Sequence, residues 1–154
     1  MRNDSRLSRM LHVLIHLAER DAPATSDDIA TMLDTNPVVV RRTMAGLREA
    51  GYVRSVKGHG GGWSLARPLG AITLLDIHEA LGAPAPFAFG MANDTPSCLV
   101  EQAVNAHLAE AMAAAEAVLQ ARLAGATLAD IAADFQQQQR AAAGRRRGAR
   151  RGRS

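Results

Sequence analysis

The 154-residue chain is poor in cysteine, aromatic side chains and long apolar runs. Its single cysteine, Cys98, excludes an intrachain disulfide and favours a cytoplasmic location. No apolar run is long enough to span a bilayer and no secretory signal is visible, so no membrane contact is expected. Aromatic residues make up 3% of the chain and apolar residues 47%, which predicts an aliphatic core. Because no nucleophile–base pair and no P-loop are present, the sequence does not predict an enzyme.

The net charge of +3 is distributed over three segments of different sign. Residues 1–67 carry +3, residues 68–139 carry −7, and residues 140–154, with seven arginines and no acid, carry +7. A polyanion attracts the first segment and repels the second. We therefore expect the acidic segment to lie away from any nucleic acid that the first segment binds.

Residues 25–51 have the pattern of two short helices joined by a tight turn. The first helix can begin at Thr25, which has the spacing of a capping box with Asp28. The second can be capped by Asn36, with Pro37 at the first position, where a missing N–H is tolerated. The buried face of the second helix is expected to comprise Val40, Met44 and Leu47.

A glycine-rich segment follows, between two short strand-like runs. Residues 58–62 contain four glycines in five positions, which permits positive φ and close approach of the backbone to another surface. Lys57 and His59 place positive or potentially positive charge at this tip, and Trp63 is expected to pack behind it. Two helices, a tight turn and a two-stranded hairpin form the winged type of DNA-binding helix-turn-helix.

The second helix and the hairpin tip carry side chains suited to DNA. Arginine can bond guanine through two hydrogen bonds, and valine can contact the methyl group of thymine. The alternative is a solvated basic helix face beside an exposed hairpin tip. The predicted DNA-binding residues are Arg2, Arg6, Ser26, Asn36, Val38, Val39, Arg41, Arg42, Arg48, Lys57, His59, Gly60 and Gly61.

The remaining chain contains a long helix over residues 99–124, in which ten of 26 residues are alanine. At 1.5 Å per residue it extends about 39 Å, so it needs a partner surface, most simply its copy in a second subunit. Its apolar stripe comprises Val104, Leu108, Met112, Ala115, Leu119 and Leu123, widened by Ala111 and Val118. The predicted fold is mainly α with a small β-hairpin wing, organised as a winged helix-turn-helix domain (1–82), a loop (83–97), a dimerisation helix with a short C-terminal helix that ends at Phe135 (98–136) and a disordered arginine-rich tail (137–154).

Two further features allow a functional or a plain interpretation. His12 and His16, four residues apart on one helix, could share a metal, but no other ligand cluster is evident and surface histidines are favoured. No metal site is therefore predicted. Cys98 begins the long helix, where its thiol can be activated to sense oxidants, or it is a small packing residue.

Together these residues resemble the Rrf-two family of bacterial transcriptional regulators. The resemblance covers about residues 4–135 and is carried by the helix-turn-helix and by segments 47–53, 58–68 and 72–77. It implies a homodimer formed through the long helix and binding to palindromic operator DNA. Many members hold an iron–sulfur cluster on three cysteines before the long helix, whereas this sequence has only Cys98 there and is closest to the YwnA-like branch. No cofactor is therefore expected.

The predicted function is sequence-specific binding of double-stranded DNA by a homodimeric repressor. Two alternatives stay open: a redox-responsive regulator that senses through Cys98, and a winged-helix module that binds proteins.

Overall fold

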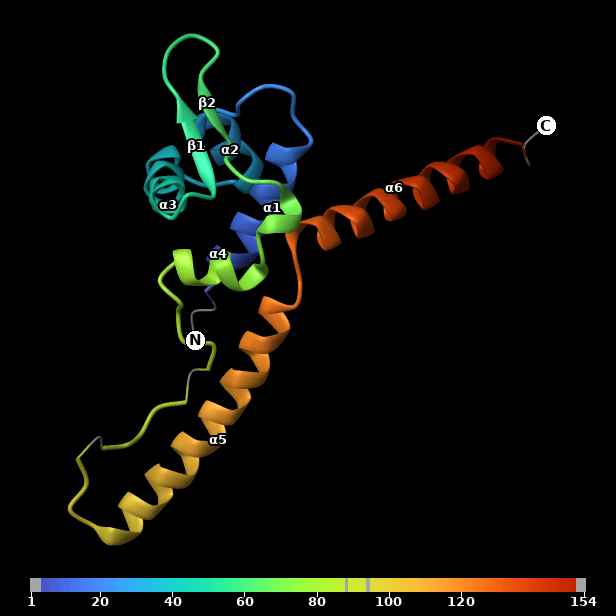
Figure 1. The fold of residues 1–154 in the computed structure, drawn as a ribbon. Coiled ribbons are helices and arrows are strands. Elements are labelled where there is room, and N and C mark those ends of the chain that lie inside the picture. Colours follow the sequence, from blue (N-terminus) through green and yellow to red (C-terminus); the bar gives the residue numbers. More distant parts are fainter. Residues whose placement is uncertain (1–3, 88, 94, 152–154) are drawn as a thin grey trace.

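The computed structural model describes residues 4–87, 89–93 and 95–151 (Figure 1). This part of the chain forms a mainly helical head with one hairpin, from which two long helices project, and it confirms the predicted fold class. The elements in chain order are α1 (Arg6–Ala18), α2 (Ser26–Leu33), α3 (Pro37–Glu49), β1 (Val53–Val56), β2 (Gly62–Leu65), the 3₁₀ helix η1 (Leu69–Ala71), α4 (Leu74–Ala80), α5 (Leu99–Ala124) and α6 (Leu128–Arg151).

The apolar core lies in the head, between α1, α3, α4 and the hairpin. The predicted buried face of α3 is confirmed, since Val40, Met44 and Leu47 are almost fully buried. α1 runs beneath the helix-turn-helix and completes its three-helix base. The residues that α1 buries are Met10, Val13, Leu14, Ile15 and Leu17.

Three helices of the described chain begin with the same reciprocal hydrogen bonds between a threonine and an aspartate three residues later. In each, the aspartate carboxylate accepts from the threonine N–H and the threonine hydroxyl accepts from the aspartate N–H. The bond from the threonine N–H is the main cause that lowers the pKa of each aspartate. The pairs are Thr25 with Asp28 at α2, Thr73 with Asp76 at α4, and Thr127 with Asp130 at α6.

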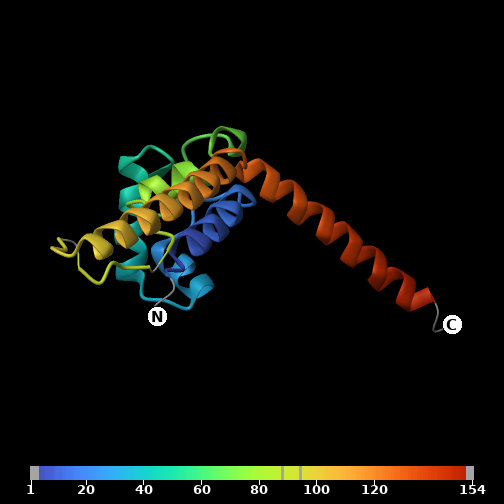
Figure 2. The same ribbon diagram turned by 90° about the horizontal axis from the view of Figure 1, so that it is seen from below.

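The turn between α5 and α6 is fixed to the head. The N–H of Leu74 donates to the carbonyl of Ala126 over 3.0 Å, and that of Leu128 donates to the carbonyl of Ile72 over 2.9 Å. The Leu128 side chain is fully buried in the core. Both long helices therefore leave the head from an anchored base, in different directions (Figure 2).

The structure corrects the predicted end of the chain. The last helix was expected to stop at Phe135 and to be followed by a disordered tail over residues 137–154, but α6 continues to Arg151. Glutamine, alanine and arginine, which dominate this segment, are good helix formers, and the last proline of the chain is Pro96. The expected disorder is therefore replaced by helix over residues 137–151, and the last part of that prediction, residues 152–154, lies outside the described residues.

Replacing Gly62 with alanine is expected to destabilise the fold by about 1–3 kcal/mol. Gly62 has φ of +148°, and a Cβ atom there would lie 2.5 Å from the carbonyl oxygen of Ala24. Gly58→Ala is the matched control, because Gly58 also has positive φ (+94°) but its Cβ would meet no described atom within 4 Å. Denaturant unfolding should show the larger loss for Gly62→Ala. Equal losses would mean that the contact with Ala24 is unimportant.

Candidate nucleic-acid interface

The exposed side of α3 carries the predicted base-reading residues. The side chain of Asn36 caps the helix by accepting from the N–H of Val38 over 2.8 Å, as the sequence predicted. Val38 and Val39 are 54% and 55% exposed, which is high for apolar side chains on a helix that packs in a core. Arg41 and Arg42 are exposed on the following turn. The helix thus separates a buried face from an apolar and basic outer face.

The charges of this outer face are available to a ligand. Within the described residues, Arg41, Arg42 and Arg48 form no ion pair with an acidic side chain. Arg48 lies in the last turn of α3 and is exposed. Unpaired guanidinium groups on one helix can bond base edges or phosphate oxygens without first losing a protein partner.

The hairpin has an open, basic tip. Gly58 and Gly60 have φ of +94° and +72°, and no described atom lies within 4 Å of where their Cβ atoms would be. Gly61 has a structural role, since its N–H donates to the carbonyl of Gly58 over 3.0 Å and a Cβ would collide with the backbone of Val56. Lys57 and His59 are exposed beside these glycines. A bare backbone flanked by cations can approach phosphates closely.

Hydrogen bonds hold the hairpin against the start of α2. Backbone bonds join Ala24 and Trp63 in both directions, at 3.0 and 2.8 Å. Trp63 is buried behind the hairpin, as predicted, and its indole N–H donates to the hydroxyl of Ser26 over 3.0 Å. This contact could not be predicted, because its partners lie far apart in the chain. A DNA contact by Ser26 stays a prediction, and its hydroxyl oxygen already accepts this bond.

One exposed cation of the hairpin was missing from the predicted site. Arg54 lies on β1 opposite Ser64 of β2, and its Nε donates to the Ser64 hydroxyl over 3.2 Å. This bond orients the guanidinium on the outer surface of the hairpin. Its position on a strand that leads to the basic tip was the available signal in the sequence.

The predicted N-terminal contacts are less well placed. Arg2 lies outside the described residues. Arg6 is bound by two side-chain nitrogens to Asp4, with Nη2 2.6 Å and Nε 3.0 Å from carboxylate oxygens. Hydrogen bonding to Arg6 lowers the pKa of Asp4 to about 2, so the carboxylate stays ionised at neutral pH. Arg6 would have to exchange this partner for a phosphate.

α3 and the hairpin lie together on one side of the head, and α6 leaves from the other side (Figure 1).

A family model for Rrf2, described as an iron-dependent transcriptional regulator, matches residues 3–134. The chain belongs to the Rrf2 family. This confirms the resemblance carried by the helix-turn-helix and the glycine-rich hairpin.

Individual relatives agree with this family. YwnA of Bacillus subtilis (strain 168), classed as an HTH-type transcriptional regulator, is 30% identical over 128 residues, covering 83% of this chain and 95% of YwnA. The structure of CymR, the global cysteine regulator of B. subtilis, matches with a TM-score of 0.57 at 26% identity, over 86% of this chain and 98% of CymR. T. potens IscR shares the fold, with a TM-score of 0.59 at 23% identity over 90% and 91% of the two chains. YwnA and CymR are described as regulators rather than enzymes, in agreement with the sequence prediction for this Rrf2 protein.

The residues of this Rrf2 chain do not fit a cysteine-ligated iron–sulfur cluster. Such a cluster needs several thiolates, and Cys98 is the one cysteine of the sequence. Among the described residues, no group of three or more histidine, cysteine or acidic side chains is placed to hold a metal ion. The helices within the described ranges do not combine the length and the apolar character that a bilayer-spanning helix requires.

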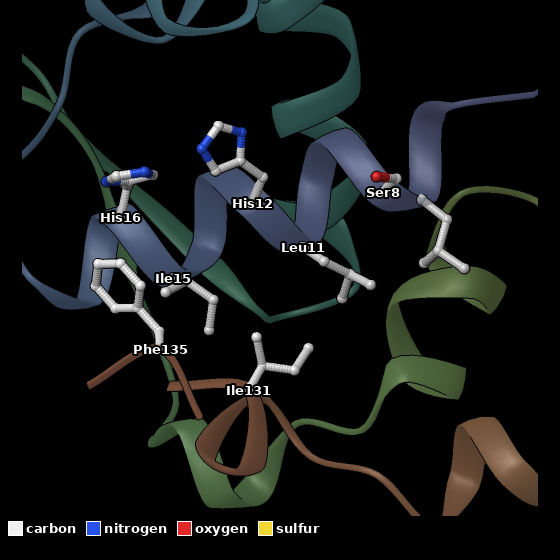
Figure 3. A pocket seen from close by; sticks show the side chains of 8 residues that line it. Ser8, Leu11, His12, Ile15, His16, Ile131 and Phe135 are labelled. Carbon is white, nitrogen blue, oxygen red and sulfur yellow. The ribbon is translucent and has the colours of Figure 1, made fainter. Parts of the chain in front are cut away.

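His12 and His16 lie at the edge of a groove between α1 and α6 (Figure 3). Their rings meet edge to face, with centroids 4.7 Å apart. The groove has a volume of about 560 Å³ and is lined mainly by aliphatic side chains of α1 and by Ile131 and Phe135 of α6. The prediction of surface histidines therefore stays in place.

Cys98 is exposed at the N-cap of α5, after the loop over residues 83–97. Its side chain makes no capping hydrogen bond that meets the usual geometry. The nearby backbone N–H groups of Glu101 and Val100 nevertheless favour the thiolate and lower the pKa of the thiol. The site thus combines access to solvent with a lowered pKa of the thiol.

Proposed function

We propose that this Rrf2 protein is a cytoplasmic, homodimeric repressor that binds palindromic operator DNA. The outer side of α3 carries the proposal, because Val38, Val39, Arg41 and Arg42 all stand clear of the core there. α3 enters the major groove, where arginine bonds guanine and valine contacts thymine methyl groups. The hairpin tip, with Lys57 nearby, follows the adjacent phosphate backbone.

The dimer of this proposal forms through α5. All 26 residues of α5 are described, and none of them is buried in the single chain. Val104, Leu108 and Val118 lie on one side of it and are 50%, 46% and 64% exposed. Apolar side chains exposed in a row on a projecting helix support a partner surface. A second copy supplies a second α3, and the two reading helices occupy successive major grooves about 34 Å apart.

Selection of binding sites from a pool of random duplex DNA tests this function. The full chain should enrich a palindromic sequence whose half-sites are separated by about one helical turn. Enrichment of a single half-site would contradict the dimer, and no enrichment would contradict sequence-specific recognition. The second outcome would favour a winged-helix module that binds protein.

The lowered pKa and exposure of Cys98 support a second candidate function, regulation by oxidants. The thiolate attacks a peroxide oxygen, the O–O bond breaks with loss of hydroxide, and a sulfenic acid forms. A second thiol, from Cys98 of the other subunit or from a small-molecule thiol, then attacks the sulfenic acid to form a disulfide and release water.

We further propose that the protein works without a resident iron–sulfur cluster.

Cys98→Ser is expected to abolish any loss of operator binding caused by hydrogen peroxide, while binding without oxidant stays unchanged. The serine is close in size but forms no sulfenic acid. Fluorescence anisotropy of labelled operator DNA, with and without peroxide, measures this. A serine variant that keeps the full response of the wild type would remove Cys98 from the mechanism.

A further inference from the structure

We infer that the outer part of α6, residues 136–151, is a second DNA-binding surface that contacts the phosphate backbone of duplex DNA regardless of sequence. This goes beyond the proposed reading of an operator by α3 and the hairpin. We call this segment the α6 arm. The inference rests on its projection from the head, on its positive charge and on its lack of aromatic and large apolar residues.

The α6 arm begins where α6 leaves the head. The first two turns of α6 are held by Leu128 and Ala132, which are buried, and by the half-buried Phe135. From Gln136 to Arg145 every residue is exposed, and the helix points into open space (Figures 1 and 2). At 1.5 Å per residue, the arm is about 24 Å long. Duplex DNA presents about fourteen phosphate charges over that length.

The charge of the α6 arm is of one sign. Within residues 136–151 there are six arginines and no acidic residue. Helix positions 140, 147 and 151 are separated by seven and four residues, and positions 146 and 150 by four. These separations place positions on one side of an α-helix. A helical segment whose sequence carries charge of one sign only matches a rod-shaped polyanion.

The like charges of the α6 arm repel one another unless a counter-charge is present. Like charges four residues apart destabilise a helix, and the positions 146 and 150 and the positions 147 and 151 form such pairs. Helices without packing partners are marginal in water. Phosphates beside the arm would replace this repulsion with attraction.

Composition selects duplex DNA among the polyanions. Residues 136–151 contain glutamine, arginine, alanine and glycine alone. The arm therefore has no aromatic ring on which single-stranded bases could stack, and no large apolar side chain to enter a bilayer. The acids of residues 68–139 in a second copy are a weaker match, because eight of them are spread over a long segment. Since α6 leaves the side of the head away from α3, the surface of the arm is separate from the reading surface (Figure 1).

The test compares two full-length variants on one duplex of random sequence. In the first, all six arginines of the arm become glutamine, which keeps helix propensity and removes charge. In the second, they become lysine, which keeps the charge. Each phosphate contact contributes about 0.9 to the slope of log Kobs against log salt, so the glutamine variant should lose at least about 3 from that slope. The substituted residues are Arg140, Arg145, Arg146, Arg147, Arg150 and Arg151.

The lysine variant should keep the slope of the wild type within about 1. An unchanged slope in the glutamine variant would overturn the inference. Tighter binding of the full-length wild-type protein to single-stranded RNA or to anionic vesicles than to the duplex would also overturn it. Salt-sensitive self-association that disappears in the glutamine variant, without any change in slope, would instead assign the arm to a second copy. Arg41→Ala with Arg42→Ala separates the two claims, because it removes operator preference and leaves the contribution of the arm to the slope.

Discussion

Arg41→Ala combined with Arg42→Ala is expected to lower affinity for the selected operator by about thirtyfold or more, since each two-bond arginine–guanine contact contributes about 1–3 kcal/mol. Both side chains are exposed on α3 and, within the described residues, neither forms an ion pair. The fold should be unaffected, because the core face of α3 is untouched. Operator titration by fluorescence anisotropy and thermal unfolding measure the two effects.

The matched control for this pair is Arg9→Ala with Arg20→Ala, which removes the same charge from exposed positions on α1 and in the turn that follows it. Arg20 has a long contact of 3.9 Å with Asp28 between exposed side chains, which contributes little to stability. The control should lose affinity only slightly, through the change in net charge. Equal losses in both double variants would show that α3 acts through general charge and does not read bases.

Val104→Glu combined with Val118→Glu is expected to convert the dimer into monomers and to lower operator affinity by about 10²-fold or more, because two linked half-site contacts become independent. Both valines are at least half exposed on α5 and lie on the same side of the helix. In a symmetric dimer, four carboxylates would enter an apolar interface. Analytical ultracentrifugation gives the oligomeric state, and titration gives the affinity.

Ala113→Glu with Ala117→Glu places the same charges on the opposite side of α5, where both positions are exposed. This variant should remain dimeric and keep its affinity. If the two variants behave alike, the apolar side of α5 is not the dimer surface. A wild-type protein that is monomeric at the concentration that saturates the operator would contradict the dimer altogether.

The helix-turn-helix could be predicted because its determinants are local in sequence. Asn36 caps α3 and Pro37 occupies the first position of that helix. Thr25 and Asp28 form the capping box of α2, as their spacing indicated. The bounds of α5, residues 99–124, also agree with the prediction, since a long alanine-rich run without glycine or proline has few competing structures.

Features that depend on tertiary contacts or on side-chain conformation could not be predicted in the same way. The bond from Trp63 to Ser26 joins residues that the sequence separates widely, and the pairing of Arg6 with Asp4 depends on side-chain conformation. The predicted end of α6 at Phe135 was wrong, because the glutamine, alanine and arginine residues that follow have high helix propensity. Which of the predicted residues touch DNA is set by a partner, so those contacts stay predictions.

The most direct test of the central claim, that α3 reads a duplex sequence while the hairpin holds the adjacent backbone, is a ratio of affinities. It compares the selected operator with a scrambled duplex of the same length and composition, at one physiological salt concentration. For the full chain, the operator should bind at least about 10³-fold more tightly, as specific regulators do. Equal affinity for the two duplexes would contradict the claim.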